Sequence, residues 1–485
     1  MRLAERPILA LCLLLAVSAA LRLIALPTFP EVVADEGLWT NSSKNFVAFG
    51  DWFMDGRKHL FLSPVFHGLS VGLFEVFGPA IATARAISGV AGTVSVLLLY
   101  WLVLRVTARR DLAFVSATLL GVTADFVFQS RLALIESLQL CFLLASALAL
   151  ASGGTRGALT GGLAFGVALL TKANAASFAV VLPFFLIGGG RLRDVVRDPV
   201  WLGRCLLFGS VAFGSAAAVY AALYLQHPDL FIAAFRFELD GLHFAGLSHP
   251  LVQLGRFGVD PVQMSRSLLD LFRESPFLMV LATLGCVFAV ILRRPPALAF
   301  AVWALFGSGF VLVQLYQPPR YFHAMAPAFC FFAAVAMLAW RDEDGGSTQR
   351  LPRAALAVYV AFNLGYLLMN AAANPARQVA SVTRWVREHT RPSDHILAAG
   401  YHCTDLPNRA YAHYYLGNDM AQLAASIDRY AIDYVITDIY EWSPALRGEL
   451  AARYEKVQEW PFGQVFRVRP ELPPASGGNP DREQP

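Results

Sequence analysis

The chain has 485 residues, of which 56% are hydrophobic and 15% charged, with a formal net charge of +4 and a mean hydropathy of +0.51. Soluble domains carry about 25% charged residues, so this composition excludes an ordinary soluble globule. The six cysteines are scattered and lie mostly in apolar stretches, which predicts neither a disulfide framework nor a zinc site. We expect a lipid bilayer as the environment of the chain and no nucleic-acid partner.

Apolar runs of about 20 residues, each long enough to cross ~30 Å of hydrocarbon, recur along most of the chain. They lie near 8–26, 61–78, 86–104, 112–128, 132–151, 157–171, 174–190, 202–225, 276–292, 297–316, 321–339 and 354–372. The first run is longer than the apolar region of a signal peptide, so we predict that it is retained as a span. The pattern predicts a polytopic membrane protein.

The arginines orient these spans. If every run crossed the membrane, the arginine clusters at 105–110, 191–197 and 293–294 would lie outside, against the positive-inside rule. If the run 61–78 lies along the interface instead, all three clusters become cytoplasmic, and its Pro64, His67 and Glu75 suit that role. We therefore expect about eleven spans plus interfacial helices in the first outer loop, a cytoplasmic N-terminus and an extracytoplasmic C-terminus.

Composition changes near residue 374, which predicts a transmembrane domain over 1–373 and an extracytoplasmic α/β domain over 374–470. Within the second domain we expect helices over 378–389 and 443–457 and strands near 395–400, 434–438 and 463–469. The segment 471–485, rich in Pro, Gly and charged residues, is predicted to be a disordered tail. The expected fold is mostly α, a transmembrane helix bundle with a small C-terminal α/β domain.

This topology places charged and polar groups at the outer ends of the apolar runs. A charge at membrane depth costs at least about 2.5–3.5 kcal/mol, and snorkelling explains one such group better than a whole set on one face. The pattern therefore predicts an outward-facing polar cavity. Its candidate residues are Asp35, Glu36, Arg57, Lys58, His59, Arg131, Glu136, Lys172, Arg320 and Tyr321.

Seven of these residues lie in four motifs that resemble, in the same order, those of C-type (GT-C) membrane glycosyltransferases. The motifs are "ADEGLW" with the acidic pair, "SRLALIES" with Arg131 and Glu136, "GLAFGVALLTKAN" ending near Lys172, and "QPPRYFHAMAPAF" with Arg320 and Tyr321. The chain is similar to the protein O-mannosyltransferase and lipid A aminoarabinose transferase group. It departs from that pattern at Leu62, where a lysine is common, and at Glu136, where aspartate is commoner.

The resemblance implies a transferase that moves a sugar from a polyprenyl-phosphate-linked donor to an acceptor hydroxyl of a protein, lipid or cell-envelope glycan. The reaction is expected on the outer side of a bacterial cytoplasmic membrane. Because the leaving phosphate is already a good anion, the chemistry needs a carboxylate base and cations on the phosphate. We assign Asp35 as the base, with Glu36 beside it, and Arg131, Lys172 and Arg320 as the phosphate clamp. Such an attack inverts the anomeric centre.

Three alternatives remain at this point. Asp35 and Glu36 could hold a divalent cation, although the sequence supplies no clear third ligand, so we expect no cofactor. The pair could instead be structural, as carboxylates in the first turn of a helix. The whole chain could be a transporter or a lipid-linked-sugar flippase, which would favour internal repeats and charges near mid-membrane rather than at one face.

Overall fold

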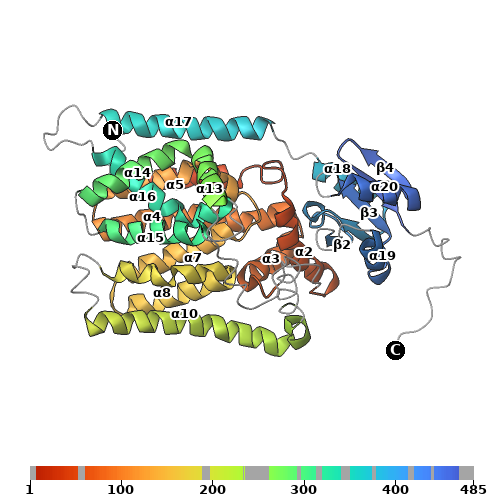
Figure 1. Cartoon of the computed structure of the whole chain (residues 1–485), viewed down its shortest axis with the longest axis horizontal. Helices are drawn as coiled ribbons and strands as arrows, with labels where there is room; N and C mark the ends of the chain where they lie inside the picture. The colour runs from red at the N-terminus through yellow and green to blue at the C-terminus, as the bar shows by residue number, and fades with distance from the viewer. Residues whose placement is uncertain are drawn as a thin grey trace. The chain divides into compact units, whose positions relative to one another are not determined.

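The computed structural model describes residues 7–52, 60–187, 197–232, 234, 261–291, 296–312, 319–339, 350–373, 378–412, 420–438 and 442–468. The chain divides into two compact units, Met1–Arg377 and Gln378–Pro485. The first unit is helical, and the second contains the sheet (Figure 1). The prediction of a mostly helical chain with a small C-terminal sheet is confirmed. Of the candidate residues, Arg57, Lys58 and His59 lie outside the described residues.

The first unit begins with α1 (Pro7–Leu23), α2 (Ala34–Phe49), α3 (Pro64–Phe77), α4 (Ile81–Thr107), α5 (Arg110–Val122), α6 (Ala124–Ser130), α7 (Glu136–Ala151) and α8 (Gly154–Thr171). It continues with η2 (Ala173–Val180), η3 (Leu182–Leu186), α10 (Pro199–Gln226), α13 (Pro261–Glu274), α14 (Pro276–Ile291), α15 (Pro296–Leu312), η5 (Pro319–Met325), α16 (Ala326–Ala339) and α17 (Arg350–Ala373). Several of these helices start at proline, whose missing N–H costs nothing in a first turn.

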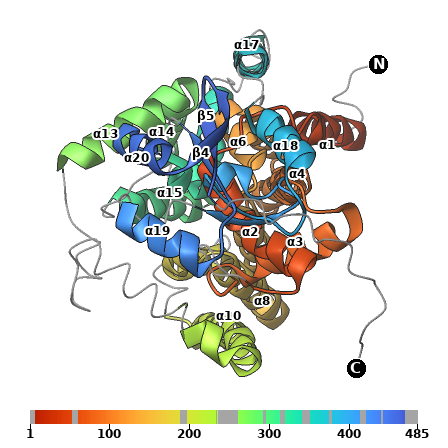
Figure 2. The same cartoon turned by 90° about the vertical axis from the view of Figure 1, so that its right-hand side faces the viewer.

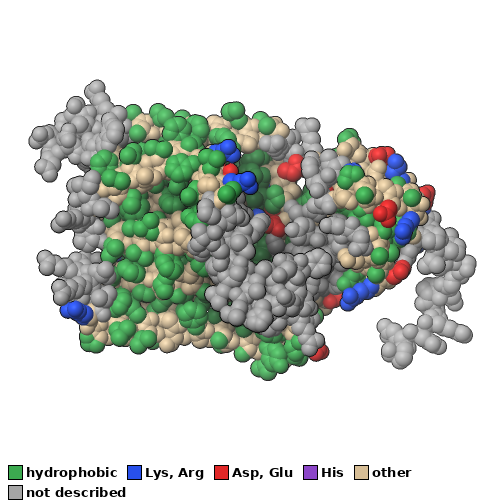
Figure 3. All heavy atoms as spheres, in the orientation of Figure 1, with side chains coloured by type: hydrophobic (Ala, Val, Ile, Leu, Met, Phe, Trp, Pro, Cys, Tyr) green, Lys and Arg blue, Asp and Glu red, His purple; other side chains and the backbone are tan. Residues whose placement is uncertain are grey.

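The helices pack into one bundle around an apolar core. α4 contacts α1, α5 and α7, α8 lies between α7 and α10, and α16 packs against α5 and α14. Figure 2 looks nearly along α17 and shows it at the edge of this bundle. On the face shown in Figure 3, the helical unit presents mostly hydrophobic and uncharged side chains, as a lipid-facing surface does.

Within the described residues, four helices are long and apolar enough to cross a membrane, or up to six if each of two bent pairs forms one span. The predicted runs near 8–26, 132–151 and 297–316 form shorter apolar helices, and α7 begins only at Glu136. The run 174–190 forms the 3₁₀ helices η2 and η3, with Pro183 in the first turn of η3. The expected number of spans therefore remains a prediction.

The glycines of helix α8 are explained by the close packing of this helix against α10. A Cβ at Gly162 would lie 2.8 Å from the carbonyl oxygen of Phe208, so only glycine allows the two backbones to approach this closely. At Gly166, one turn further on, a Cβ would lie 2.9 Å from the carbonyl oxygen of Ala212, so the close contact continues toward the C-terminal end of α8, where Lys172 follows in an extended conformation.

The second unit consists of α18 (Gln378–His389), β1 (His395–Ala398), η6 (Gly400–His402), β2 (Arg409–Ala412), α19 (Met420–Arg429), β3 (Tyr434–Asp438), α20 (Pro444–Arg453), β4 (Glu455–Trp460) and β5 (Gly463–Arg467). The strand order is β2-β1-β3-β5-β4. β1 runs parallel to β2 and β3, and β5 is antiparallel to β3 and β4. The central strand β3 is buried along its whole length.

The strands predicted near 395–400, 434–438 and 463–469 are confirmed as β1, β3 and β5. The helix predicted over 443–457 ends earlier, because Tyr454 is extended and the chain continues as β4. β4 has little apolar alternation of its own, and it forms because its backbone pairs with β5 at the edge of the sheet.

Candidate active site

Four segments that are far apart in the sequence bring charged side chains together in the helical unit. Arg320 Nη2 lies 2.6 Å from Asp35 Oδ2, and Arg320 Nε lies 3.5 Å from Glu136 Oε1. Lys172 Nζ lies 2.8 Å from the same Glu136 oxygen and 4.2 Å from the centre of the Tyr321 ring. We call these five residues the Asp35–Arg320 cluster.

Each member of the cluster lies at or near the end of a helix. Asp35 is in the first turn of α2 and Glu136 is the first residue of α7, where the partial positive charge of a helix N-terminus favours a carboxylate. Lys172 follows the last residue of α8, where the helix dipole favours a cation. Arg320 and Tyr321 lie in η5. The helix ends therefore support the charges that meet there.

The cluster is accessible enough to bind a ligand. The side chains of Asp35 and Arg320 are 23% and 24% exposed, and those of Lys172 and Glu136 are 15% and 9% exposed. Glu136 Oε2 is buried and forms no hydrogen bond to the described residues. The Tyr321 ring supports the Lys172 ammonium through a cation–π contact, which leaves ammonium protons available for an anion.

Glu36 lies outside this cluster, although it is adjacent to Asp35 in the sequence. Its two carboxylate oxygens accept from Arg85 Nε and Nη2 at 2.7 Å each, and both side chains are fully buried. The same carboxylate accepts from the backbone N–H groups of Val33 and Ala133. Arg85 also donates to the carbonyl oxygens of Leu26 and Pro30. This network ties the start of α2 to α4 and to the segment between α6 and α7, so Glu36 has a structural position.

Arg131 is likewise separated from the cluster. Its guanidinium donates five hydrogen bonds to backbone carbonyls at the end of α1 and in the segment that follows it, those of Leu21, Ile24, Ala25 and Phe29. The residue is 4% exposed. Each of the three guanidinium nitrogens of Arg131 therefore already donates to a carbonyl oxygen of α1 or of the segment after it. The structure places Arg131 as a support for that turn rather than beside Lys172 and Arg320.

Two buried residues near the cluster were not predicted from the sequence. Arg85 lies within an otherwise apolar span, and an arginine at that depth is a signal for a buried partner. His323, two residues after Tyr321, stacks on Phe126 at 4.4 Å between ring centroids, and its Nε2 lies 3.3 Å from Ser137 Oγ. His323 therefore anchors η5 against α6 and α7.

Among the residues that the structure describes, no three His, Cys, Asp or Glu side chains lie together as ligands for a metal ion. Asp35 and Glu36 have different neighbours, Arg320 in one case and Arg85 in the other. The described residues therefore offer cations, rather than a set of metal ligands, around the candidate base.

Comparison with known proteins supports the resemblance seen in the motifs. Residues 63–215 match the family of dolichyl-phosphate-mannose-protein mannosyltransferases. A search of curated proteins finds no match. Among solved structures, the apo form of ArnT from Cupriavidus metallidurans has a TM-score of 0.69 at 14% identity and covers 94% of this chain and 97% of its own. The form of ArnT bound to undecaprenyl phosphate has a TM-score of 0.66 at 14% identity, and the match covers 96% of this chain and 98% of its own.

A second protein has the same fold over most of this chain. The apo oligosaccharyltransferase from Archaeoglobus fulgidus has a TM-score of 0.57 at 14% identity, over 89% of this chain and 69% of its own. The family match covers two of the four motifs, the one with Arg131 and Glu136 and the one that ends near Lys172. Residues 63–215 thus match one family of glycosyltransferases, and most of the chain shares the fold of ArnT and of the archaeal oligosaccharyltransferase, in agreement with the resemblance to C-type membrane glycosyltransferases.

Proposed function

We propose that this protein transfers a sugar from a polyprenyl-phosphate-linked donor to an acceptor hydroxyl on the outer side of a bacterial cytoplasmic membrane. The observation that carries the proposal is the Asp35–Arg320 cluster, in which two cations and two carboxylates from four segments meet at 2.6–3.5 Å. The donor class is supported by the similar fold of ArnT, whose structure was solved with undecaprenyl phosphate.

The chemistry assigns separate roles to the members of the cluster. Lys172 and Arg320 bind the donor phosphate, whose negative charge grows as the bond to the sugar breaks. Asp35 accepts the proton of the acceptor hydroxyl, which attacks the anomeric carbon from the face opposite the phosphate and inverts it. Glu136 holds Lys172 in place through their 2.8 Å ion pair. The phosphate leaves as an anion, so no general acid is needed.

In this arrangement, binding of the donor phosphate is linked to release of Asp35 from Arg320. Arg320 Nη2 contacts the carboxylate of Asp35, so a phosphate that binds the same edge of the guanidinium competes with Asp35. Arginine is suited to this exchange because its planar fork matches both carboxylate and phosphate oxygens. Once displaced from Arg320, the Asp35 carboxylate is available to the acceptor hydroxyl.

The proposed reaction is tested by its by-product. Purified protein incubated with a labelled lipid-linked sugar and an envelope extract as acceptor source should release free polyprenyl phosphate and transfer the label. A flippase or transporter would move the intact lipid-linked sugar between leaflets without releasing polyprenyl phosphate. Failure to release it with any donor sugar tested, while the lipid is bound, would contradict the transferase proposal.

Loss of either cation should weaken donor binding. Lys172→Ala and Arg320→Ala each remove a charged hydrogen bond worth about 1.5–3 kcal/mol, so the Kd for polyprenyl phosphate should rise by about 10–150-fold. Lys456→Ala, which removes an exposed lysine of the second unit, is the control and should bind normally. Unchanged affinity in both cluster variants would remove Lys172 and Arg320 from the clamp.

Arg131→Ala should behave differently from these two variants. Because its five hydrogen bonds all go to backbone carbonyls, its removal should lower the melting temperature. Donor affinity measured on the folded fraction should stay near that of the wild type. A large loss of affinity without loss of stability would return Arg131 to the clamp.

The proposed outer location of the site is tested by labelling single cysteines in a cysteine-free variant. Position 227, which follows α10, should react with a membrane-impermeant maleimide added to intact cells, whereas position 109 between α4 and α5 should react only after lysis. Labelling of position 109 from outside would reverse the topology and place the Asp35–Arg320 cluster on the cytoplasmic side.

A further inference from the structure

Lys172 lies at a break between two helices. α8 ends at Thr171 and η2 begins at Ala173, so Lys172 joins them in an extended conformation. The last carbonyl oxygens of a helix have no partner within it, and the interior of a membrane supplies no water to bond them. The segment 171–174 therefore needs side chains of other helices to hold it.

Ser63 bonds the backbone directly before Lys172. It is fully buried and precedes α3, where a serine usually bonds an N–H group of its own helix. Ser63 makes no such bond to the described residues of α3, and its hydroxyl donates instead to the Thr171 carbonyl oxygen at 2.7 Å. The residue that precedes α3 thus supplies a partner that the end of α8 lacks.

Gln139 holds the chain just after Lys172. Its side chain is buried, and its Nε2 donates to Asn174 Oδ1 at 2.7 Å. The Asn174 carbonyl oxygen accepts from Ser177 Oγ at 2.9 Å, so this asparagine is held at its side chain and at its backbone. Gln139 lies three residues after Glu136 on α7, and residues at that spacing are neighbours on a helix surface. One face of α7 therefore contacts both the Lys172 ammonium and Asn174.

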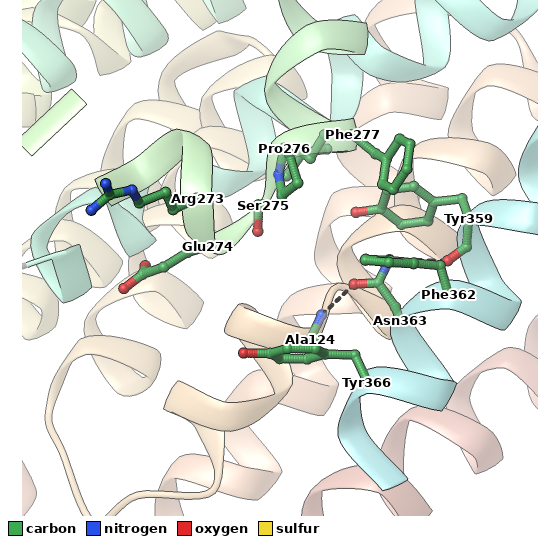
Figure 4. Close-up of a pocket in the computed structure, with 11 residues that line it drawn as sticks. Ala124, Arg273, Glu274, Ser275, Pro276, Phe277, Tyr359, Phe362, Asn363 and Tyr366 are labelled. Carbon is green, nitrogen blue, oxygen red and sulfur yellow. Dashed lines mark hydrogen bonds between the residues drawn. The ribbon is translucent and has the colours of Figure 1, made fainter. Parts of the chain in front are cut away.

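A polar side chain also holds a second helix break. Between α5 and α6, the Asn363 side chain of α17 accepts from the backbone N–H of Ala124 at 2.7 Å (Figure 4). The pocket drawn there is lined by none of the residues of the Asp35–Arg320 cluster. Both breaks are thus held by side chains of neighbouring helices, but only the segment between α8 and η2 carries a residue of the cluster.

The position of this segment directs the Lys172 ammonium. A lysine has a flexible four-carbon stem, so the reach of its ammonium depends on where the backbone is held. The ammonium has three protons, and Glu136 Oε1 accepts one of them at 2.8 Å. A phosphate can therefore accept another without breaking this ion pair, provided that the backbone keeps its position.

We propose that Ser63 and Gln139 are positioning residues for donor binding, which act through Lys172 without touching the donor. This inference rests on the proposed function, because it takes Lys172 as a ligand of the donor phosphate. When either bond is lost, the segment 171–174 samples positions from which the ammonium does not reach the phosphate. The apparent Kd then rises by the factor by which the binding-competent fraction falls.

Binding of polyprenyl phosphate to the full-length protein in detergent tests this proposal. Ser63→Ala and Gln139→Leu should each raise the Kd by about three- to tenfold, an effect of the size that loss of one neutral hydrogen bond allows. In a Lys172→Ala background, the same two changes should alter the Kd by less than about twofold, because the residue through which they act is gone. Losses of affinity that multiply in the double variants would overturn the positioning role.

Ser146→Ala is the matched control for stability. Ser146 is also fully buried, and its hydroxyl donates to the carbonyl oxygen of Gly161, ten residues before Thr171 on α8, at 2.8 Å. Ser146→Ala and Ser63→Ala each remove one serine bond to α8, so they should lower the melting temperature by similar amounts. Only Ser63→Ala should weaken donor binding. An equal rise of the Kd in both variants would show that affinity follows stability, and would overturn the proposal.

The outcomes for these variants separate the positioning role from the proposed function. If Lys172→Ala weakens binding but Ser63→Ala and Gln139→Leu bind normally, Lys172 remains in the clamp and the positioning role is wrong. If Lys172→Ala binds as the wild type does, the clamp and the positioning role both fail. If one of Ser63→Ala and Gln139→Leu does not fold, the other still decides.

Discussion

Asp35→Asn is expected to slow sugar transfer by about two to four orders of magnitude, the usual contribution of a general base. Asparagine keeps the shape of the side chain and can still contact Arg320, but it cannot accept the proton of the acceptor hydroxyl. Because the amide competes less strongly than a carboxylate for the guanidinium, donor affinity should be unchanged or higher. Turnover of a labelled lipid-linked sugar and equilibrium binding of polyprenyl phosphate, both on purified protein, measure the two effects.

The alternatives for Asp35 predict other outcomes. If Asp35 only stabilises the start of α2, Asp35→Ala should cost about 1 kcal/mol of stability without a specific loss of turnover. If the acidic pair binds a divalent cation, a chelator should inactivate the wild type and excess cation should restore it. Transfer by Asp35→Asn at a rate near that of the wild type would eliminate Asp35 as the base, whatever the effect of a chelator.

Glu36→Gln should destabilise the protein much more than it alters the chemistry of the folded fraction. The substitution leaves the Arg85 guanidinium fully buried without its carboxylate, and breaking a buried ion pair in this way costs about 3–5 kcal/mol. It also weakens the acceptor of the Val33 and Ala133 backbone N–H groups. Thermal unfolding in detergent, followed by tryptophan fluorescence, should show a clearly lower melting temperature.

An exposed ion pair serves as the control for this effect. Arg109 Nη2 and Asp111 Oδ2 are also 2.7 Å apart, but their side chains are 35% and 32% exposed. Such a pair contributes about 0–1 kcal/mol, so Asp111→Asn should leave the melting temperature almost unchanged. Equal melting temperatures for Glu36→Gln and the wild type would show that the buried pair does not stabilise the fold.

Most of the candidate site could be predicted from local sequence. Asp35, Glu136, Lys172, Arg320 and Tyr321 each interrupt or end an apolar run, and a charge in that position is costly unless it has a partner or a function. The predicted spans put all five residues at the same side of the membrane, so we expected them to lie close together. The strands β1, β3 and β5 were also readable, because short β-branched and aromatic runs between polar segments favour buried strands.

Other features could not be read from sequence because they depend on neighbours. Adjacent residues of a helix face different directions, and only the packing of α4 against α2 shows that Glu36 meets Arg85 while Asp35 meets Arg320. Arg131 looked equivalent to Lys172, yet its guanidinium donates to carbonyl oxygens at the end of α1 and in the segment after it. β4 likewise forms through pairing with β5 rather than through its own propensity.

The sequence by itself determined the membrane environment, the mostly helical class and the set of charged residues at one face, since each depends on composition and on the spacing of apolar residues along the chain. The tertiary structure alone decided which of those charges share a site and which are fixed in the interior. The physical reason is that a buried charge must be paired. The sequence specifies where the charge lies along the chain, whereas the packing of distant helices specifies its partner.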